Sequence, residues 1–203
     1  MKFELHQGDL PDGIEFGDSV AVDTETMGLH PRRDRLCLVQ LSAGDEKCHL
    51  VQLKAGEYDA PNLKALMADP KVLKIFHYAR FDVATLRHHL GVVTLPVYCT
   101  KIASRLARTY TDRHSLKDLC AEMFKVDISK QQQQSDWGAD KLSREQLEYA
   151  ATDVLYLHRI KEILDARLAR EGRTGLAQAC FDFIQHRAAL DLAGWNDIDV
   201  FDH

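Results

Sequence analysis

The sequence predicts an α/β fold in which a mixed sheet is flanked by helices and followed by a helical C-terminal part. Short apolar runs alternate with helix-like segments through the first half of the chain. Beyond about residue 100 the apolar residues recur mainly at helical spacing. The 203 residues suffice to bury one sizeable core, so we expect a single domain.

The N-terminal third is expected to form an antiparallel meander. Residues 1–18 are a polar lead-in with turn signals around Gly8 and Gly13. Three strands follow, at 19–24, 36–42 and 48–53. Short breaks containing glycine separate these strands, which favours antiparallel pairing of neighbours.

The remaining chain is expected to add one strand and then mostly helices. Leu63, Leu66 and Met67 stand at helical spacing. Ser143 followed by Gln146 is a capping-box pattern, which marks the start of a long helix. The expected elements are a helix at 60–68, a strand at 71–76, and helices at 80–90, 101–108, 115–124, 143–170 and 174–189.

The composition restricts the class of protein. The net charge of −5 argues against a large basic surface that grips duplex nucleic acid, but it does not exclude nucleic acid as a substrate. No apolar run approaches the roughly 18–20 residues of a membrane span, and we expect neither a secretory signal nor a membrane partner. Five scattered cysteines without a CxxC pair predict reduced thiols and a cytoplasmic location.

Two carboxylates close the first predicted strand. Asp23 and Glu25 stand two residues apart, so their side chains share one face of the strand. Two acids placed together beside a buried run repel each other and lose solvation. A divalent cation between them would relieve both costs. The pair therefore predicts half of a metal site.

Three later residues complete a pattern with this pair. Asp82 stands near a helix start, and Tyr149 precedes Asp153 by four residues on one helix face. Considered alone, Asp82 would be interpreted as a residue that stabilises a helix N-terminus. The Tyr149–Asp153 pair, considered alone, would be interpreted as a structural contact. Their order along the chain, after the Asp-x-Glu pair, is far more specific than any one of them.

This ordered pattern resembles the DEDD superfamily of 3′–5′ exonucleases in its tyrosine branch. The histidine branch would carry histidine where Glu148 stands. The runs Val22–Thr26, Phe81–Asp82, Ser135–Trp137 and Glu148–Val154 are also similar to ribonuclease D, over about residues 15–170. A similarity to the short NrnC-type nano-RNases spans nearly the whole chain, through the runs His6–Pro11, Arg33–Cys37, Cys99–Ser104, Thr109–His114, Ile128–Gln133 and Gly194–Trp195.

The resemblance implies a DnaQ-like (RNase H-like) fold and a ring-shaped homo-octamer. It implies one exonuclease domain over residues 1–203, with a catalytic core at about 15–170, a C-terminal helix and tail at 171–203, and no HRDC domain. Two Mg²⁺ or Mn²⁺ ions would be the cofactors, because hard cations prefer carboxylate oxygen. The implied metal ligands are Asp23, Glu25, Asp82 and Asp153, and Tyr149 would orient the attacking water.

Further residues are expected to contact the substrate. Leu29 would wedge between two bases, although a core leucine after a turn is the alternative. His77 would contact ribose or phosphate, unless it is a satisfied polar residue at a strand end. The remaining predicted contacts are Thr24, Lys130, Gln134, Ser135 and Trp137, of which the last four lie in a segment that could instead be an ordinary surface loop.

Two local features leave their roles open. Lys101, Arg105 and Arg108 form a helical stripe, which by default is a solvated face and otherwise an RNA path or a subunit contact. Tyr78 stands where many superfamily members carry asparagine four residues before the motif II aspartate. A substrate contact made by that asparagine therefore does not carry over, whereas the metal-ligand assignment of Asp82 does.

The leading functional hypothesis is a metal-dependent 3′–5′ exoribonuclease that degrades dinucleotides and other nano-RNA to nucleoside 5′-monophosphates. The first alternative is a broader ribonuclease D-like exonuclease that acts on structured RNA 3′ ends or on DNA ends. The second alternative is a catalytically inactive nucleic-acid-binding module, which would have no need of a carboxylate cluster.

Overall fold

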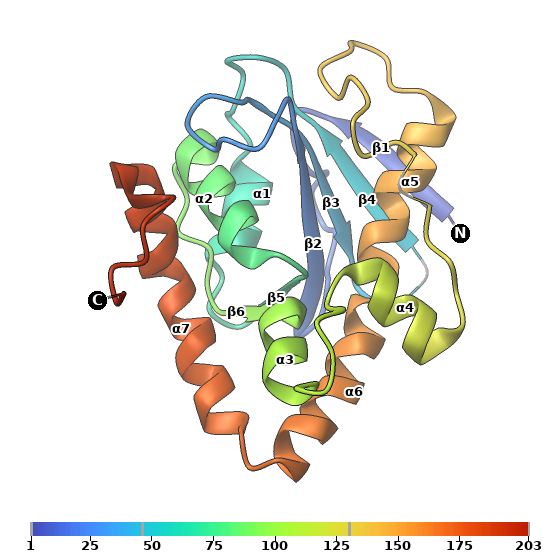
Figure 1. The fold of residues 1–203 in the computed structure, drawn as a ribbon. Helices are drawn as coiled ribbons and strands as arrows, with labels where there is room; N and C mark the ends of the chain where they lie inside the picture. The colour runs from blue at the N-terminus through green and yellow to red at the C-terminus, as the bar shows by residue number, and fades with distance from the viewer. Residues whose placement is uncertain (1, 46, 130, 203) are drawn as a thin grey trace.

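The computed structural model describes residues 2–45, 47–129 and 131–202, and within them one six-stranded mixed sheet forms the centre of the molecule (Figure 1). The strands run in the order β1-β4-β3-β2-β5-β6 across the sheet. Their bounds are β1 Lys2–Gln7, β2 Ser19–Thr26, β3 Leu36–Ser42, β4 Lys47–Gln52, β5 Leu73–Phe76 and β6 Val97–Cys99.

The sheet confirms the expected meander and extends it on both sides. Strands β2, β3 and β4 pair antiparallel, whereas β5 and β6 continue the sheet parallel to β2. The expected polar lead-in is wrong for Lys2–Gln7, because this segment pairs parallel with β4 as an edge strand. The side chains of this strand are mostly exposed, so its sequence lacks the apolar run by which a buried strand is predicted. The short β6 was likewise not expected.

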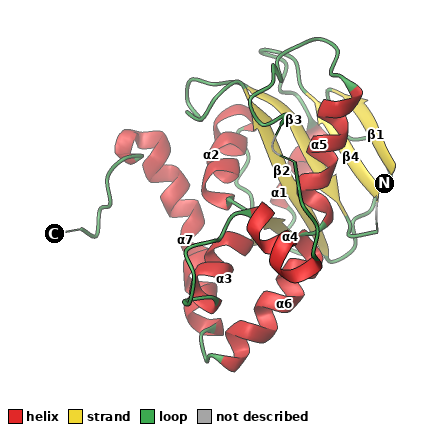
Figure 2. Ribbon diagram, turned by 45° about the vertical axis from the view of Figure 1, so that its right-hand side comes forward, coloured by secondary structure: helices red, strands yellow, loops and turns green. Residues whose placement is uncertain are grey.

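Helices cover both faces of the sheet. Figure 1 shows α2 on one side and α5 on the other, and both helices contact β2 and β3. Helices α3, α4 and α6 gather at the lower end of the sheet, and α7 runs upward beside α2, which it contacts (Figure 2). Together they form the predicted helical part. The bounds are α1 Pro61–Ala68, α2 Ala79–Leu90, α3 Thr100–Ala107, α4 Leu116–Phe124, α5 Arg144–Leu155, α6 Leu157–Arg170 and α7 Thr174–Leu190, followed by a π-helical turn at Asp191–Trp195.

The prediction of one continuous helix over 143–170 is wrong, because the chain forms two helices there, α5 and α6. The predicted start of the helix is confirmed. Ser143 and Gln146 form both hydrogen bonds of the capping box. Tyr156 then separates α5 from α6, and its ring lies 5.6 Å from the ring of Phe124. The segment contains neither glycine nor proline, so no local signal marks the break. The break lets α6 leave the sheet and pack on α3.

The core lies on both faces of the central strands. Every residue of β3 is buried, and Val20, Ala21 and Val22 of β2 are inaccessible to solvent. This burial holds the end of β2 rigidly between α2 and α5. Within the described ranges, no helix is both long and apolar enough to cross a bilayer.

Candidate active site

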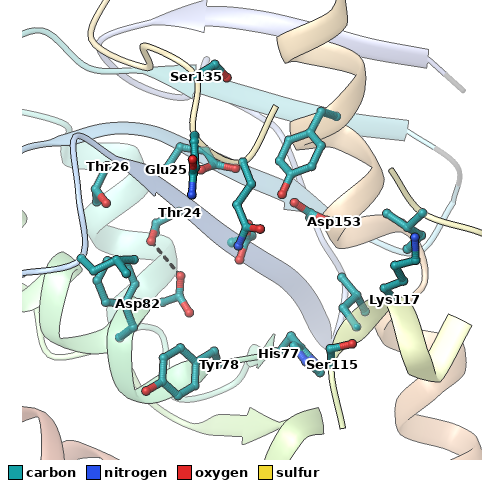
Figure 3. Close-up of a pocket in the computed structure, with 18 of the residues that line it drawn as sticks. Thr24, Glu25, Thr26, His77, Tyr78, Asp82, Ser115, Lys117, Ser135 and Asp153 are labelled. Carbon is teal, nitrogen blue, oxygen red and sulfur yellow. Dashed lines mark hydrogen bonds between the residues drawn. The ribbon is translucent and has the colours of Figure 1, made fainter. Parts of the chain in front are cut away.

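A cleft of about 710 Å³ opens at the carboxyl end of β2 (Figure 3). Strand β2 contributes Asp23 and Glu25, the first turn of α2 contributes Asp82, and α5 contributes Tyr149 and Asp153. The three segments are far apart in the sequence. The fold therefore brings all five predicted catalytic residues to one cleft.

Carboxylate oxygens from β2 and α5 converge within this cleft. Asp23, Glu25 and Asp153 each offer an oxygen within 4.8 Å of the others. Asp82 lines the same cleft and accepts a hydrogen bond of 2.7 Å from the hydroxyl of Thr24. Thr24 was predicted to contact substrate, but its buried hydroxyl is engaged in holding Asp82. Such a set of hard oxygen ligands fits Mg²⁺ or Mn²⁺.

Gln40 is a residue of the site that the sequence did not reveal. It is fully buried in β3, directly opposite Asp23 in the strand register. Its amide nitrogen lies 3.4 Å from an oxygen of Asp23 and 3.4 Å from an oxygen of Glu25. One amide thus donates toward both carboxylates and orients them. Only the pairing register of β2 with β3 could have identified it.

The cluster is electrostatically unfavourable without a cation. Burial, followed by the charges of the other acids, raises the pKa of Asp23 well above its usual range, and Glu25 behaves likewise. Burial raises the pKa of Asp82 to about 7, against the opposing hydrogen bond from Thr24. Burial also raises the pKa of Asp153 to about 7. These directions are expected where carboxylates await a positive partner.

Tyr149 remains protonated in this environment. Burial and then the negative charge of Asp153 raise its pKa far above that of free tyrosine. The phenol can therefore donate a hydrogen bond but cannot serve as a base near neutral pH. Trp137 lies against it, with ring centroids 6.0 Å apart.

The predicted substrate-contacting residues differ in how far their side chains are exposed in the cleft. Leu29 is 81% exposed at the cleft, which excludes the alternative of a core leucine. His77 also lines the cleft, and its Nδ1 lies 2.9 Å from the hydroxyl of Thr100. Burial lowers the pKa of His77 to about 3, so its imidazole is neutral.

The segment before α5 is only partly available to a ligand. Gln134 and Ser135 line the cleft. Trp137 is only 2% exposed and does not line the cleft, so it supports Tyr149 and is not placed to stack on a base. Lys130, another predicted contact, lies outside the described residues.

The basic stripe on α3 does not act as one surface. Lys101 lines the cleft, with its ammonium 4.4 Å from the ring of Tyr78, and Lys117 lines the cleft from α4. Arg108 is instead 1% exposed and paired with Glu122, which contradicts a solvated face at that position. Arg105 is exposed away from this cleft. Figure 3 shows Ser115 and Lys117 on the side of the cleft opposite Glu25 and Asp82, whereas Tyr78 lies on the Asp82 side with its ring turned away from the acids.

Comparison with known proteins agrees with this arrangement. A family described as 3′-5′ exonuclease matches residues 10–169. Ribonuclease D of Acidiphilium cryptum is 37% identical over 171 residues, which cover 84% of this chain and 41% of that protein. The chain thus spans about two-fifths of the length of the curated relatives it matches.

Solved structures give the same result. Brucella melitensis NrnC with bound Mg²⁺ is 53% identical, covers both chains completely and superposes with a TM-score of 0.96. The structure of NrnC bound to pGG is 54% identical, with a TM-score of 0.97 over 100% of this chain and 99% of that one. Escherichia coli RNase D is 25% identical, with a TM-score of 0.75 over 85% of this chain and 45% of that one. The chain therefore belongs to the 3′–5′ exonuclease family of nucleases and has the RNase H-like fold of its ribonuclease D-type members.

Proposed function

We propose that this chain is a metal-dependent 3′–5′ exoribonuclease that degrades very short RNA, including dinucleotides, to nucleoside 5′-monophosphates. The observation that carries the proposal is the meeting of four acids and Tyr149 in one cleft with an exposed Leu29 at its rim. The acids suit phosphodiester hydrolysis, and the exposed leucine suits a limit on substrate length.

The acids and Tyr149 have separate roles in the proposed reaction. Asp23, Glu25, Asp82 and Asp153 would hold two divalent cations, which when bound polarise the attacking water and stabilise the leaving 3′ oxygen. Gln40 keeps the two β2 carboxylates oriented. Tyr149 donates a hydrogen bond that aims the water, because its raised pKa keeps the proton on the phenol.

The cleft has the dimensions of a site for a small ligand. Its volume of about 710 Å³ lies within the roughly 300–1,000 Å³ typical of such pockets. Leu29 projects from the loop after β2, where it can insert between two stacked bases. NrnC, which matches this chain over its full length, has been solved with pGG, a ligand that by its name contains two guanosines. We infer a preference for dinucleotides from these two facts.

Polar groups across the cleft would hold the sugar and phosphate. The neutral imidazole of His77 can share a hydrogen bond with a ribose hydroxyl. Lys117 and Ser115 line the wall facing the carboxylates and can bind a phosphate away from the metals. Gln134 and Ser135 line the cleft beside Tyr149.

A broader ribonuclease D-like activity on structured RNA 3′ ends or DNA ends uses the same acids. Substrate length therefore separates it from the dinucleotide proposal. We propose a time course on a 5′-labelled heptaribonucleotide, the matching DNA and a labelled dinucleotide, all at one salt concentration. Fastest cleavage of the dinucleotide supports the proposal, and a rate that rises steadily with length contradicts it.

The catalytic assignment needs its own control. Asp23→Ala is expected to abolish hydrolysis, whereas Asp45→Ala, in the exposed turn before β4, is expected to leave it unchanged. Circular dichroism should show that both variants are folded. Full activity of Asp23→Ala would contradict the catalytic assignment, and full activity of the wild type in excess EDTA would favour a metal-independent site. A folded wild type that hydrolyses none of the substrates in Mg²⁺ or Mn²⁺ would favour an inactive binding module.

Assembly and location complete the proposal. We propose that residues 1–203 act as one exonuclease domain in a homo-octamer, as the family resemblance implies. Exposed apolar side chains near the C-terminus, including Leu176, Trp195 and Phe201, provide surface for subunit contacts. The cysteines Cys37, Cys48, Cys99, Cys120 and Cys180 are unpaired, which agrees with a reducing cytoplasm. Light scattering after gel filtration would measure the mass, and a monomer would contradict the ring.

A further inference from the structure

Three potential metal ligands converge where β1 pairs with β4, outside the cleft. The Nε2 of His6 lies 3.0 Å from the Nδ1 of His49, and an oxygen of Glu4 lies 3.7 Å from the same Nδ1. One ligand atom from each of the three residues lies within 4.8 Å of the others. We call Glu4, His6 and His49 the β1–β4 histidine site.

This site is separate from the carboxylate cluster. In the register of the sheet, Asp23 is paired with Gln40, and Gln40 with Leu50. His49 is the neighbour of Leu50 in β4, so its side chain projects from the opposite face of the sheet. Strands β4 and β3 also separate β1 from β2. A ligand of one site therefore cannot serve the other.

Hydrogen bonding within the β1–β4 histidine site joins only two of its three members, and Glu4 pairs instead with Lys47. The Nδ1 of a neutral His49 either donates one proton or accepts one. Its partner is His6, at 3.0 Å, so the Glu4 oxygen at 3.7 Å makes no hydrogen bond to this nitrogen. A cation between the three atoms would satisfy them together.

The distances fit a tetrahedral ion with nitrogen ligands. Zinc bonds to histidine nitrogen and carboxylate oxygen are about 2.0–2.2 Å, which places neighbouring ligand atoms roughly 3.3–3.5 Å apart. The observed separations of 3.0 and 3.7 Å lie on either side of this range. Two imidazoles favour Zn²⁺ and similar transition metals over Mg²⁺. Phe16 packs its edge against the ring of His49, with centroids 5.7 Å apart, and thereby restrains that ligand.

We propose that the β1–β4 histidine site binds one Zn²⁺ or a similar transition-metal ion, which fastens the edge strand β1 to the sheet. Such an ion would add a side-chain link between β1 and β4, because the side chains of β1 are mostly exposed and add little packing to the backbone pairing. The two histidines and Glu4 supply three ligands, and Glu4, with 51% of its side chain exposed, leaves the fourth position open to water. The site is structural and independent of phosphodiester hydrolysis.

Lys47 provides a specific test of this assignment. Its ammonium lies 3.0 Å from the other oxygen of Glu4, so it competes with a cation for that carboxylate. Removing the ammonium should therefore raise the affinity for zinc if the three residues form a metal site. If they form only a hydrogen-bonded histidine pair, removing the ammonium should not raise it. Lys47→Gln is therefore expected to bind Zn²⁺ more tightly than the wild type.

The experiment is a Zn²⁺ titration of the full chain by calorimetry, with excess Mg²⁺ present to occupy the carboxylate cluster. Co²⁺ replaces Zn²⁺ in a parallel titration, because tetrahedral Co²⁺ with nitrogen ligands absorbs in the visible range. We expect one equivalent of Zn²⁺ for the wild type and at least about tenfold weaker binding for His6→Gln and His49→Gln. His88→Gln is the matched control, since His88 also contacts a second histidine, His89, at a centroid distance of 4.8 Å.

The proposal is overturned if the wild type binds no Zn²⁺ under these conditions, or if His6→Gln and His88→Gln bind it equally. His49 is buried, so its variant could fail to fold; His6→Gln and Lys47→Gln then decide the question. Exonuclease activity in Mg²⁺ should be the same for the wild type, His6→Gln and Lys47→Gln. This separates a failure of the zinc site from a failure of the proposed hydrolysis.

Discussion

Replacing Asp153 with asparagine is expected to stabilise the metal-free protein while it abolishes hydrolysis. Asn is nearly isosteric with Asp but carries no charge, so the change removes the electrostatic cost and leaves the packing of α5 intact. The cost arises because burial and the charge of Asp82 oppose ionisation of Asp153. A residue retained for function can thus reduce the stability of the fold.

The size and sign of the effect follow from the pKa. The rise from 3.8 to about 7 corresponds to about 4 kcal/mol when Asp153 is ionised in both states. Because the folded pKa lies above the unfolded value, the wild type loses this stability as the pH rises from about 4 through about 7. Asp153 retains some solvent contact, so we expect a gain of about 2–4 kcal/mol at pH 8 and less than half of it at pH 5.

The assay is thermal unfolding in EDTA at pH 5 and pH 8, followed by circular dichroism. A gain of this size in a chain of 203 residues raises the midpoint by roughly 4–16 °C. Glu145→Gln, in the exposed first turn of the same helix, is the control and should change stability by no more than about 0.5 kcal/mol. Added Mg²⁺ should stabilise the wild type more at pH 8 than at pH 5, and Asp153→Asn much less.

One outcome would refute the reasoning directly. If Asp153→Asn melts at or below the wild-type temperature at pH 8 in EDTA, burial and the charge of Asp82 do not oppose ionisation of Asp153 as the structure indicates. A gain of equal size at both pH values would also contradict it, because the cause would then be something other than ionisation.

Three further substitutions test separate parts of the structure. Gln40→Leu should weaken Mg²⁺ binding and lower activity by roughly 10–100-fold, since it removes the amide between the two β2 carboxylates; unchanged calorimetric affinity would contradict this. Leu29→Ala should reduce the preference for a dinucleotide over a heptanucleotide without changing the melting temperature, whereas the exposed apolar control Val93→Ala should alter neither. Arg108→Ala should cost about 1–3 kcal/mol in urea unfolding, because it removes the buried hydrogen bonds to Ser104 and to the carbonyl of Arg113, while Glu122 keeps its ion pair with Arg167. Arg105→Ala on the exposed side of α3 should cost about 0.5 kcal/mol or less.

The sequence by itself determined the features that depend on local periodicity. Two-residue spacing on a strand puts Asp23 and Glu25 on one face, and four-residue spacing on a helix does the same for Tyr149 and Asp153. The capping box at Ser143 was likewise predictable, because both of its hydrogen bonds close within one turn. The order of these local patterns along the chain also led to the family.

Only the tertiary structure decided the features that depend on partners distant in the sequence. The edge strand Lys2–Gln7 is held by pairing with β4, and the break at Tyr156 occurs in a segment without a helix breaker. Gln40 reaches the acids through the register of β2 with β3, and Arg108 is buried by its pairing with Glu122. Composition and spacing carry no information about such long-range contacts, because the free energy that decides them comes from packing and pairing between separate elements.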